Sequence, residues 1–283
     1  MSVPSQGLVA PHVLAAVLAD PGVFVLDCRS GPDGAGRAAF EQGHIPGAAH
    51  TDYGADAWRV KIGGAPGMMP ERAEVAGKLG RLGLEPYHRL VICPAGLSAN
   101  DLAAAARIAW SARMAGHRAV ALLDGGFAGW VAAGLPVATG ASLPRPATDY
   151  PLAPPTAQRR SAAEVLAAVT KGTATLVDGR AESYYRGREK ASEALAAGHI
   201  PGAINIDYVM AYDALTNRLK SPAQLATVYA TLPPGAVISY CNTGHTAALN
   251  WFVLAEVLGR DDVALYDGSM TDWTQDMSRP VSI

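Results

Sequence analysis

Short apolar runs rich in branched residues alternate along the chain with longer alanine-rich segments. Strands are predicted where such a run ends at a cysteine, as at residues 90–92 and 237–240. Helices are predicted over the alanine-rich stretches that follow, at residues 101–115 and 247–258. Strands that alternate with helices in this order are typically parallel and joined by crossover helices, so the pattern predicts open α/β sheets.

The N-terminal residues 8–18 are apolar enough to suggest a signal peptide. The first lysine or arginine is Arg29, so the basic region that opens such a signal is missing. The stretch is instead predicted to be an alanine-rich helix that leads to Asp20-Pro21-Gly22. No window reaches the roughly 18 uncharged apolar residues that a membrane span requires, so none is expected.

Four motifs in the first half of the chain recur in the same order in the second half. The pairs are VFVLDCR (23–29) with ATLVDGR (174–180), GHIPGA (43–48) with GHIPGA (198–203), CPAGLSA (93–99) with CNTGHTA (241–247), and LDGGFAGW (123–130) with YDGSMTDW (266–273). Chance similarity would not preserve four motifs in one order, so the chain contains the same module twice. Each module is predicted to form its own open, mainly parallel sheet flanked by helices.

The boundary between the modules is predicted from proline content. Residues 141–157 contain five prolines, a composition that does not pack as a helix and is typical of a semi-rigid linker. We therefore expect an N-terminal domain at residues 1–140 and a C-terminal domain at residues 158–283.

Composition narrows the function further. The 283 residues are 49% hydrophobic and 17% charged, which is typical of a globular protein and not of a disordered one. A formal net charge of -2 provides no basic field for nucleic acid, so that partner is not expected. Three cysteines are an odd number in a long chain, which favours reduced thiols and a cytoplasmic location. One of these thiols is a candidate nucleophile.

Cys241 is the strongest candidate, because it ends a predicted strand and opens a tight loop before a helix. Gly244 would allow a positive φ, and the loop N–H groups together with the positive helix end would stabilise a thiolate. The pKa of the thiol would then fall below its ordinary value of about 8.5. Thr246 is predicted to cap the helix and to donate its hydroxyl toward the sulfur.

The other two cysteines are weaker candidates. Cys28 is predicted to be a core residue, because its counterpart in the second copy is Gly179. Cys93 matches Cys241 in the motif, but Pro94 removes one backbone donor from its loop. The sequence leaves open whether Cys93 has a catalytic or accessory role.

These motifs together resemble the tandem-domain rhodaneses, sulfurtransferases of the thiosulfate or 3-mercaptopyruvate type, over nearly the whole chain. The resemblance implies a non-catalytic N-terminal domain and a catalytic C-terminal domain whose nucleophile is Cys241. It implies that Cys241 takes sulfur from a small-molecule donor as a persulfide and passes it to a thiophilic acceptor such as cyanide or a thiol. No cofactor is implied.

The loop that should select the donor matches neither type. Thiosulfate enzymes resemble CRKGxT and mercaptopyruvate enzymes CGSGxT, whereas Asn242 and Thr243 here are neutral but match neither. His245 adds a group that titrates near neutral pH, or it is simply an exposed hydrogen-bonding residue. The loop residues 242–246 are the predicted anion-binding residues. The preferred donor therefore stays open.

Outside the loop, the arginines that the family uses before the second GHIPGA motif are replaced by Tyr184 and Glu193. Arg186, and less directly the nearby Arg188, are candidate substitutes, although an arginine in a charged loop is often only solvated. The resemblance also makes Asp52 a candidate acidic residue near the active site.

Several recurring residues are predicted to be structural. The Asp-x-Arg pairs are expected to build the strand ends, and the histidines and tryptophans of the repeated motifs to lie in the fold; they are Asp27, Arg29, Asp178, Arg180, His44, His199, Trp130 and Trp273. No Cys-x-x-Cys pair or ligand-like histidine spacing occurs, so no metal site is expected.

Two alternative functions also use a reactive cysteine. A phosphatase or arsenate reductase loop needs Cys-x5-Arg, but the sixth residue after Cys241 is Ala247 and the sixth after Cys93 is Ala99. A protein persulfide relay that delivers sulfur to the thiol of a partner protein is not excluded by any residue, and it remains the alternative function.

Overall fold

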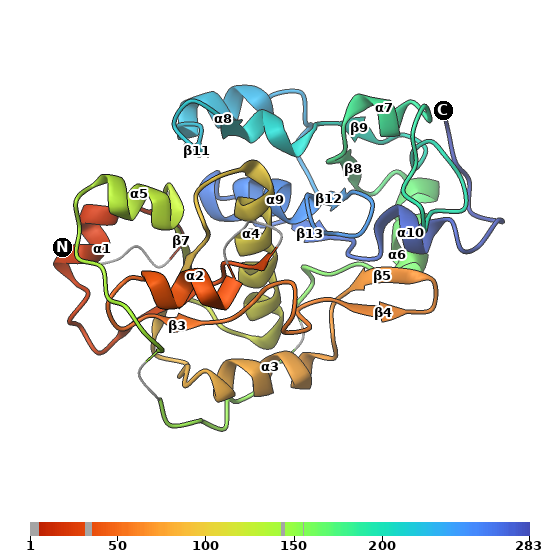
Figure 1. Cartoon of the computed structure of the whole chain (residues 1–283). Helices are drawn as coiled ribbons and strands as arrows, with labels where there is room; N and C mark the ends of the chain where they lie inside the picture. Colours follow the sequence, from red (N-terminus) through yellow and green to blue (C-terminus); the bar gives the residue numbers. More distant parts are fainter. Residues whose placement is uncertain (1–5, 32–35, 143–144, 155) are drawn as a thin grey trace. The chain divides into compact units, whose positions relative to one another are not determined.

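The computed structural model describes residues 6–31, 36–142, 145–154 and 156–283 (Figure 1). The chain divides into two compact units that are not simply consecutive in sequence. Unit 1 comprises the described residues of Met1–Trp58, Pro70–Pro155 and Asp213–Leu219, and unit 2 those of Arg59–Met69, Thr156–Tyr212 and Lys220–Ile283. Each unit therefore includes one short segment from the sequence of the other module.

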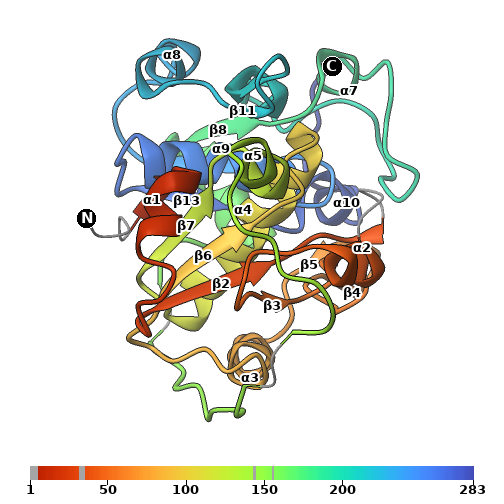
Figure 2. The same ribbon diagram turned by 60° about the vertical axis from the view of Figure 1, so that its left-hand side comes forward.

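Unit 1 is built on a five-stranded sheet in the order β1-β7-β6-β2-β3, in which every neighbouring pair is parallel (Figure 2). The predicted open α/β sheet is confirmed. Its central strands are buried along their length, as expected where helices cover both faces of a parallel sheet. The strands are β1 (Gln6–Val9), β2 (Val23–Asp27), β3 (Ala49–His50), β6 (Arg89–Cys93) and β7 (Val120–Leu123).

Helices connect the strands of unit 1. They are α1 (Pro11–Ala16), α2 (Gly36–Gln42), α3 (Arg72–Arg81), α4 (Ala99–Ala115) and α5 (Gly126–Ala132). The prediction of one helix over residues 8–18 is partly wrong, because Leu8 and Val9 pair with β7 as strand β1. The helix begins only at Pro11, whose fixed φ suits a first helical position.

Unit 2 repeats this design with a four-stranded parallel sheet in the order β13-β12-β8-β9. Its strands are β8 (Thr175–Asp178), β9 (Ile204–Asn205), β12 (Val237–Tyr240) and β13 (Val263–Leu265). Its helices are α6 (Ala162–Lys171), α7 (Glu182–Tyr185), η2 (Tyr208–Ala211), α8 (Pro222–Val228), α9 (Ala247–Phe252), η3 (Val253–Val257) and α10 (Ser269–Trp273). The helix predicted at residues 247–258 is present, but its second half, η3, is a π-helix.

Two small two-stranded sheets were not predicted from the sequence. Strands β4 (Val60–Ile62) and β5 (Ala65–Met68) form a hairpin that belongs to unit 2. Strands β10 (Tyr212–Asp213) and β11 (Arg218–Leu219) form the other pair, and residues 213–219 belong to unit 1.

The repeated Asp-x-Arg pairs are structural, as predicted. Arg29 bonds to both carboxylate oxygens of Asp27 and to the carbonyl of Gly43, which opens the GHIPGA motif. Arg180 makes the same bonds to Asp178 and to Gly198 in unit 2. Both carboxylates are fully buried, and a buried charge must be paired in this way.

The other repeated residues also have structural roles. Each motif histidine pairs its backbone with a distant segment, His44 with Ala138 and His199 with Ser282. The side chains of Trp130 and Trp273 are fully buried in the cores of their units. These predictions are confirmed.

The proline-rich segment predicted as a linker is anchored where the structure describes it. Thr148 bonds through its backbone to Gly80, and the Tyr150 hydroxyl lies 2.7 Å from His117 Nδ1. Burial lowers the pKa of His117 to about 4, so this imidazole is neutral at pH 7. Residues 148–150 therefore pack as part of unit 1.

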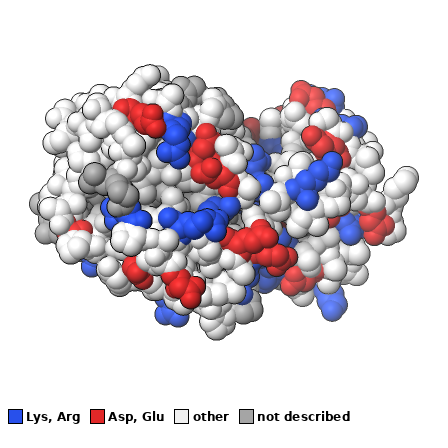
Figure 3. Space-filling model, turned by 60° about the horizontal axis from the view of Figure 1, so that its bottom comes forward, with Lys and Arg blue, Asp and Glu red and all other residues white. Residues whose placement is uncertain are grey.

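The surface matches the near-zero net charge. Lys and Arg side chains lie interspersed with Asp and Glu on the face shown in Figure 3. Within the described ranges, no helix is long and apolar enough to cross a membrane.

Candidate active site

Cys241 directly follows the carboxyl end of β12 and is 2% exposed. Its backbone N–H donates to Ser269 Oγ at 3.0 Å. Its carbonyl accepts from the Met270 N–H at 3.1 Å, and the carbonyl of Asn242 accepts from the Thr271 N–H at 3.0 Å. Within one peptide group the N–H points opposite to the C=O. Because the carbonyls of Cys241 and Asn242 face α10, the N–H groups of Asn242 and Thr243 point away from it.

The conformation of the loop agrees only in part with the sequence predictions. Gly244 has φ +68°, as predicted. Thr246 occupies the N-cap position of α9, but its side chain makes no capping bond and its φ and ψ are already helical. The prediction that Thr246 caps the helix is therefore wrong, because a capping side chain needs an extended backbone at that residue.

Arg180 is a site residue that the sequence analysis assigned only to the strand end. Its Nη1 lies 3.4 Å from Asn242 Oδ1, and it interacts electrostatically with Cys241. Burial lowers the pKa of Arg180, but the hydrogen bonds and charge of Asp178 outweigh this and raise it. The guanidinium is therefore a permanent cation beside the cysteine loop. The sequence contained a signal for this role, because Arg180 follows β8 and Cys241 follows the neighbouring strand β12.

Tyr208 in η2 is a second residue that the sequence analysis missed. Burial raises the pKa of its hydroxyl, and electrostatic interactions with Asp207 and Cys241 raise it further. The interaction places Tyr208 within electrostatic range of the thiol, with its hydroxyl protonated at neutral pH. Tyr184, another aromatic residue, lies with its ring centroid 6.0 Å from the Arg180 guanidinium.

Ser269, which accepts the Cys241 N–H, has a strained backbone conformation. Its φ is +52°, a region that non-glycine residues avoid, and its hydroxyl donates to the Tyr266 carbonyl at 2.9 Å. The corresponding residue of unit 1 is Gly126, with φ +57°. A Cβ at Gly126 would lie 2.5 Å from the Pro94 carbonyl oxygen, so unit 1 has no room for this serine.

Two substitutions separate the strain at Ser269 from its hydrogen bond. Ser269→Ala keeps the strained φ and leaves the buried Cys241 N–H without its acceptor, so we expect a free energy of unfolding about 1–3 kcal/mol lower. Ser269→Gly also removes the acceptor but relieves the strain, and it should be about 1–2 kcal/mol more stable than the alanine variant. Urea unfolding of both variants measures the difference. Equal stabilities would contradict a strained serine.

Cys93 is not the structural counterpart of Cys241. Asp27 pairs with Cys93 in the register of β2 and β6, whereas the equivalent Asp178 pairs with Tyr240 in the register of β8 and β12. Cys93 therefore corresponds to Tyr240, one residue earlier than the motif alignment indicated. Successive side chains of a strand point to opposite faces, so this offset directs Cys93 into the core.

The closing helices confirm the one-residue offset. In unit 1 the Phe127 N–H donates to the Pro94 carbonyl at 2.9 Å, where in unit 2 the Met270 N–H donates to the Cys241 carbonyl. Pro94 therefore occupies the position of the candidate nucleophile. The loop from Pro94 to the N-cap Ser98 is also one residue shorter than the loop from Cys241 to Thr246.

The position of Cys93 within its strand and in the core argues against a role as a second nucleophile. Its side chain is inaccessible and belongs to the hydrophobic core of unit 1. Burial raises the pKa of the Cys93 thiol well above its ordinary value, and the nearby Asp27 carboxylate raises it further. Cys28, predicted to be a core residue, is also buried, with its thiol 3.5 Å from the Cys93 carbonyl.

The two candidate residues outside the loop have local partners. Arg186 is exposed and pairs with Glu182 one helical turn away at 3.1 Å, an arrangement typical of a solvated ion pair. Asp52 Oδ1 accepts the N–H groups of Gly54 and Ala55, which stabilises a turn in unit 1. A role for either residue in donor binding stays a prediction.

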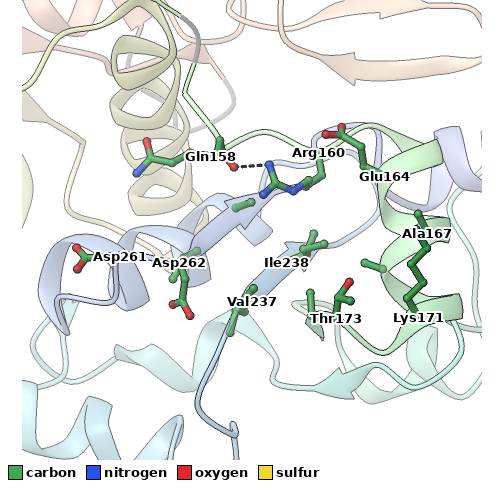
Figure 4. A pocket seen from close by; sticks show the side chains of 16 residues that line it. Gln158, Arg160, Glu164, Ala167, Lys171, Thr173, Val237, Ile238, Asp261 and Asp262 are labelled. Carbon is green, nitrogen blue, oxygen red and sulfur yellow. Dashed lines mark hydrogen bonds between the residues drawn. The ribbon is translucent and has the colours of Figure 1, made fainter.

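A separate cavity lies at the opposite end of the unit 2 sheet. It has a volume of about 660 Å³ and is lined by Thr173, Val237 and Asp262, at the amino ends of β8, β12 and β13 (Figure 4). Cys241 follows the carboxyl end of β12, so this cavity is not part of its site. No group of His, Cys, Asp or Glu side chains suited to hold a metal ion occurs among the described residues.

Comparison with known proteins identifies the fold and the chemistry. The rhodanese-like domain family matches residues 10–133 and 161–276. The chain belongs to the rhodanese family. A probable 3-mercaptopyruvate sulfurtransferase of Pseudomonas aeruginosa is 34% identical over 289 residues, 98% of each chain. The thiosulfate sulfurtransferase of Bos taurus is 31% identical over 265 residues, 89% of this chain and 85% of the relative.

Solved structures agree with these relatives. A 3-mercaptopyruvate sulfotransferase from Escherichia coli superimposes with a TM-score of 0.78 at 27% identity, over 93% of this chain and 98% of that structure. This rhodanese is therefore an enzyme, a sulfurtransferase of the type to which these relatives belong. The resemblance inferred from the repeated motifs is confirmed.

Proposed function

We propose that this rhodanese moves sulfane sulfur from thiosulfate or 3-mercaptopyruvate to a thiophilic acceptor through a persulfide on Cys241. The observation that carries the proposal is the difference between the two cysteine loops. Cys241 stands past the end of its strand, whereas Cys93 lies within its strand and in the core. The N-terminal domain at residues 1–140 is then non-catalytic, and the C-terminal domain at residues 158–283 supplies the nucleophile.

The proposed reaction has two steps. The Cys241 thiolate attacks the outer sulfur of thiosulfate, the sulfur–sulfur bond of the donor breaks, and sulfite leaves with the bonding electron pair. With 3-mercaptopyruvate the carbon–sulfur bond breaks, and pyruvate leaves after its enolate takes a proton. The acceptor then attacks the outer sulfur of the persulfide and regenerates the thiolate.

Charge in and around the loop supports binding of an anionic donor. Residues 242–246 carry no fixed charge, so their backbone amides are the proposed anion donors, with Arg180 as the neighbouring cation. His245 adds positive charge when it is protonated. The absence of lysine and arginine from the loop favours the monoanionic mercaptopyruvate over the dianionic thiosulfate.

The acceptor is proposed to be a small thiophile such as cyanide or a thiol. The alternative is relay of the persulfide sulfur to the thiol of a partner protein, which the same first step would serve. Rates with cyanide and with a protein thiol discriminate between the two. A cytoplasmic, reducing location is proposed on the three free cysteines.

Mass spectrometry after incubation with a donor tests the proposal. We expect thiosulfate or 3-mercaptopyruvate to add one sulfur atom to the peptide that contains Cys241, because this thiol ends a strand beside a cationic residue. Cyanide should remove the sulfur. The Cys93 peptide of the same digest is the control, and sulfur on Cys93 instead of Cys241 would overturn the assignment of the two domains.

A further inference from the structure

The β4–β5 hairpin comes from the sequence of the first module but packs in unit 2, with the cysteine loop. We infer that this hairpin is a positioning element of the Cys241 loop, seated on Thr243 through Gly67 and locked by the Arg159–Asp267 ion pair. The inference rests on the proposed function, because it assigns the hairpin a role in that reaction.

Gly67 lies directly against the peptide of Thr243. A Cβ on Gly67 would lie 2.6 Å from Thr243 Cβ and 2.7 Å from its carbonyl carbon, and it would overlap the carbonyl oxygen. Real Cβ atoms do not approach other atoms this closely, so any side chain at residue 67 would displace the loop. Glycine is required here for close approach of two backbones.

Contact with Gly67 completes the support of the cysteine loop. The carbonyls of Cys241 and Asn242 are held by the amides of α10, and Thr243 is the next residue along the loop. The hairpin covers Thr243 from another element. Three consecutive loop residues are thus fixed, which holds the following amides in a constant orientation toward an anion.

Asp267 locks the hairpin in place. Its Oδ2 accepts the N–H of Met69, the residue that follows β5, at 2.7 Å. Arg159 donates to both oxygens of the same carboxylate, with Nε 2.9 Å from Oδ1 and Nη2 3.0 Å from Oδ2. The carboxylate is 1% exposed, so removal of Arg159 would leave a buried charge without its cation. Asp267 also lies two residues before Ser269, the acceptor of the Cys241 N–H.

Unit 1 supplies a natural comparison. The motif residue that corresponds to Asp267 is Asp124, which pairs with Arg218 at 3.1 Å through one nitrogen. This pair is more exposed, at 20% for Asp124 and 41% for Arg218, and it lies in the unit whose cysteine is in the core. Arg218 is therefore a matched control for Arg159.

Alanine substitutions within the hairpin test the contact with Thr243. Gly67→Ala should lower kcat/KM for sulfur transfer about tenfold or more, because it shifts the backbone of the loop. Gly64→Ala is the matched control, since the three atoms nearest to its Cβ would all belong to the end of the flexible Gln275 side chain. We expect Gly64→Ala to stay within about twofold of the parent rate. Equal effects of the two substitutions, or none from Gly67→Ala, would refute the inference.

Substitution of the paired arginines tests the lock. Arg159→Gln should lower kcat/KM and speed amide hydrogen exchange in residues 59–69, whereas Arg218→Gln should change neither. Arg159→Lys keeps the charge and should recover part of the loss. A decrease in kcat/KM without faster exchange in the hairpin would overturn the proposed role of the Arg159–Asp267 ion pair. The ion pair would then affect the rate without restraining the hairpin.

A second readout keeps this inference separate from the proposed reaction. The rate at which iodoacetamide alkylates Cys241 requires no sulfur donor. Cys93, which lies within β6 and in the core of unit 1, serves as a slow reference in the same protein. Gly67→Ala should change this rate relative to Gly64→Ala at equal thermal stability. If the parent protein transfers no sulfur, the proposed function fails, while the alkylation rates still decide whether the hairpin positions the loop.

Discussion

Cys241→Ser is expected to lower sulfur transfer by at least about a thousandfold, because a serine hydroxyl is not ionised at neutral pH and does not form a persulfide. Cys93→Ala is expected to retain most of the rate, since Cys93 lies within β6 and is inaccessible. Sulfite release from thiosulfate and pyruvate release from 3-mercaptopyruvate measure the effect for both donors. The side-by-side rates of the parent protein also identify the preferred donor.

Stability must be measured with these activities. Cys93→Ser introduces a hydroxyl into the core of unit 1, so it should lower the free energy of unfolding by about 1–3 kcal/mol without removing activity from the folded protein. Assays are therefore made well below the unfolding transition. Retained turnover in folded Cys241→Ser protein would refute the assignment of the nucleophile.

Arg180→Gln is expected to affect both stability and catalysis. It leaves the fully buried Asp178 without its cation, which should lower the free energy of unfolding by about 3–5 kcal/mol. It also removes the positive charge next to Asn242 and Cys241, so KM for an anionic donor should rise about tenfold. Denaturant unfolding and steady-state kinetics measure the two effects separately.

Arg29→Gln is the matched control. Arg29 makes the corresponding buried ion pair with Asp27 in unit 1, so it should cost similar stability. The cysteine with which Arg29 interacts is Cys93, which lies in the core of unit 1, so KM of the folded protein should stay within about twofold of the parent value. An equal rise in KM in both variants would assign the Arg180 effect to stability alone.

The architecture was predictable because it depends on short-range patterns. Strand β12 and helix α4 were predicted to within two residues, since each joins a clear apolar pattern to a turn or capping residue. The structural roles of Asp178, His199 and Trp273 followed from their recurrence in both modules. These patterns are local, so they can be recognised without knowing which distant segments of the chain pack together.

The details of the site were less predictable. Thr246 does not cap α9, because the loop enters the helix with helical φ and ψ at that residue. The hairpin β4–β5 carries no strong apolar alternation, and its exposed residues gave no signal that it packs beside Thr243. Arg180 was assigned to the strand end because its second contact, with Asn242, spans 62 residues of sequence.

The two modules, their parallel sheets and the family followed from the sequence alone, as did the choice of Cys241 as candidate nucleophile, because residue type and motif order are sufficient for each. Only the tertiary structure decided that Cys93 and Cys241 are not equivalent. The Cys-x-x-Gly spacing shared by the two loops concealed a one-residue difference in strand register, which is seen in the pairing with Asp27 and Asp178. Because strand side chains alternate between faces, that one residue directs Cys93 into the core and leaves Cys241 at the strand end.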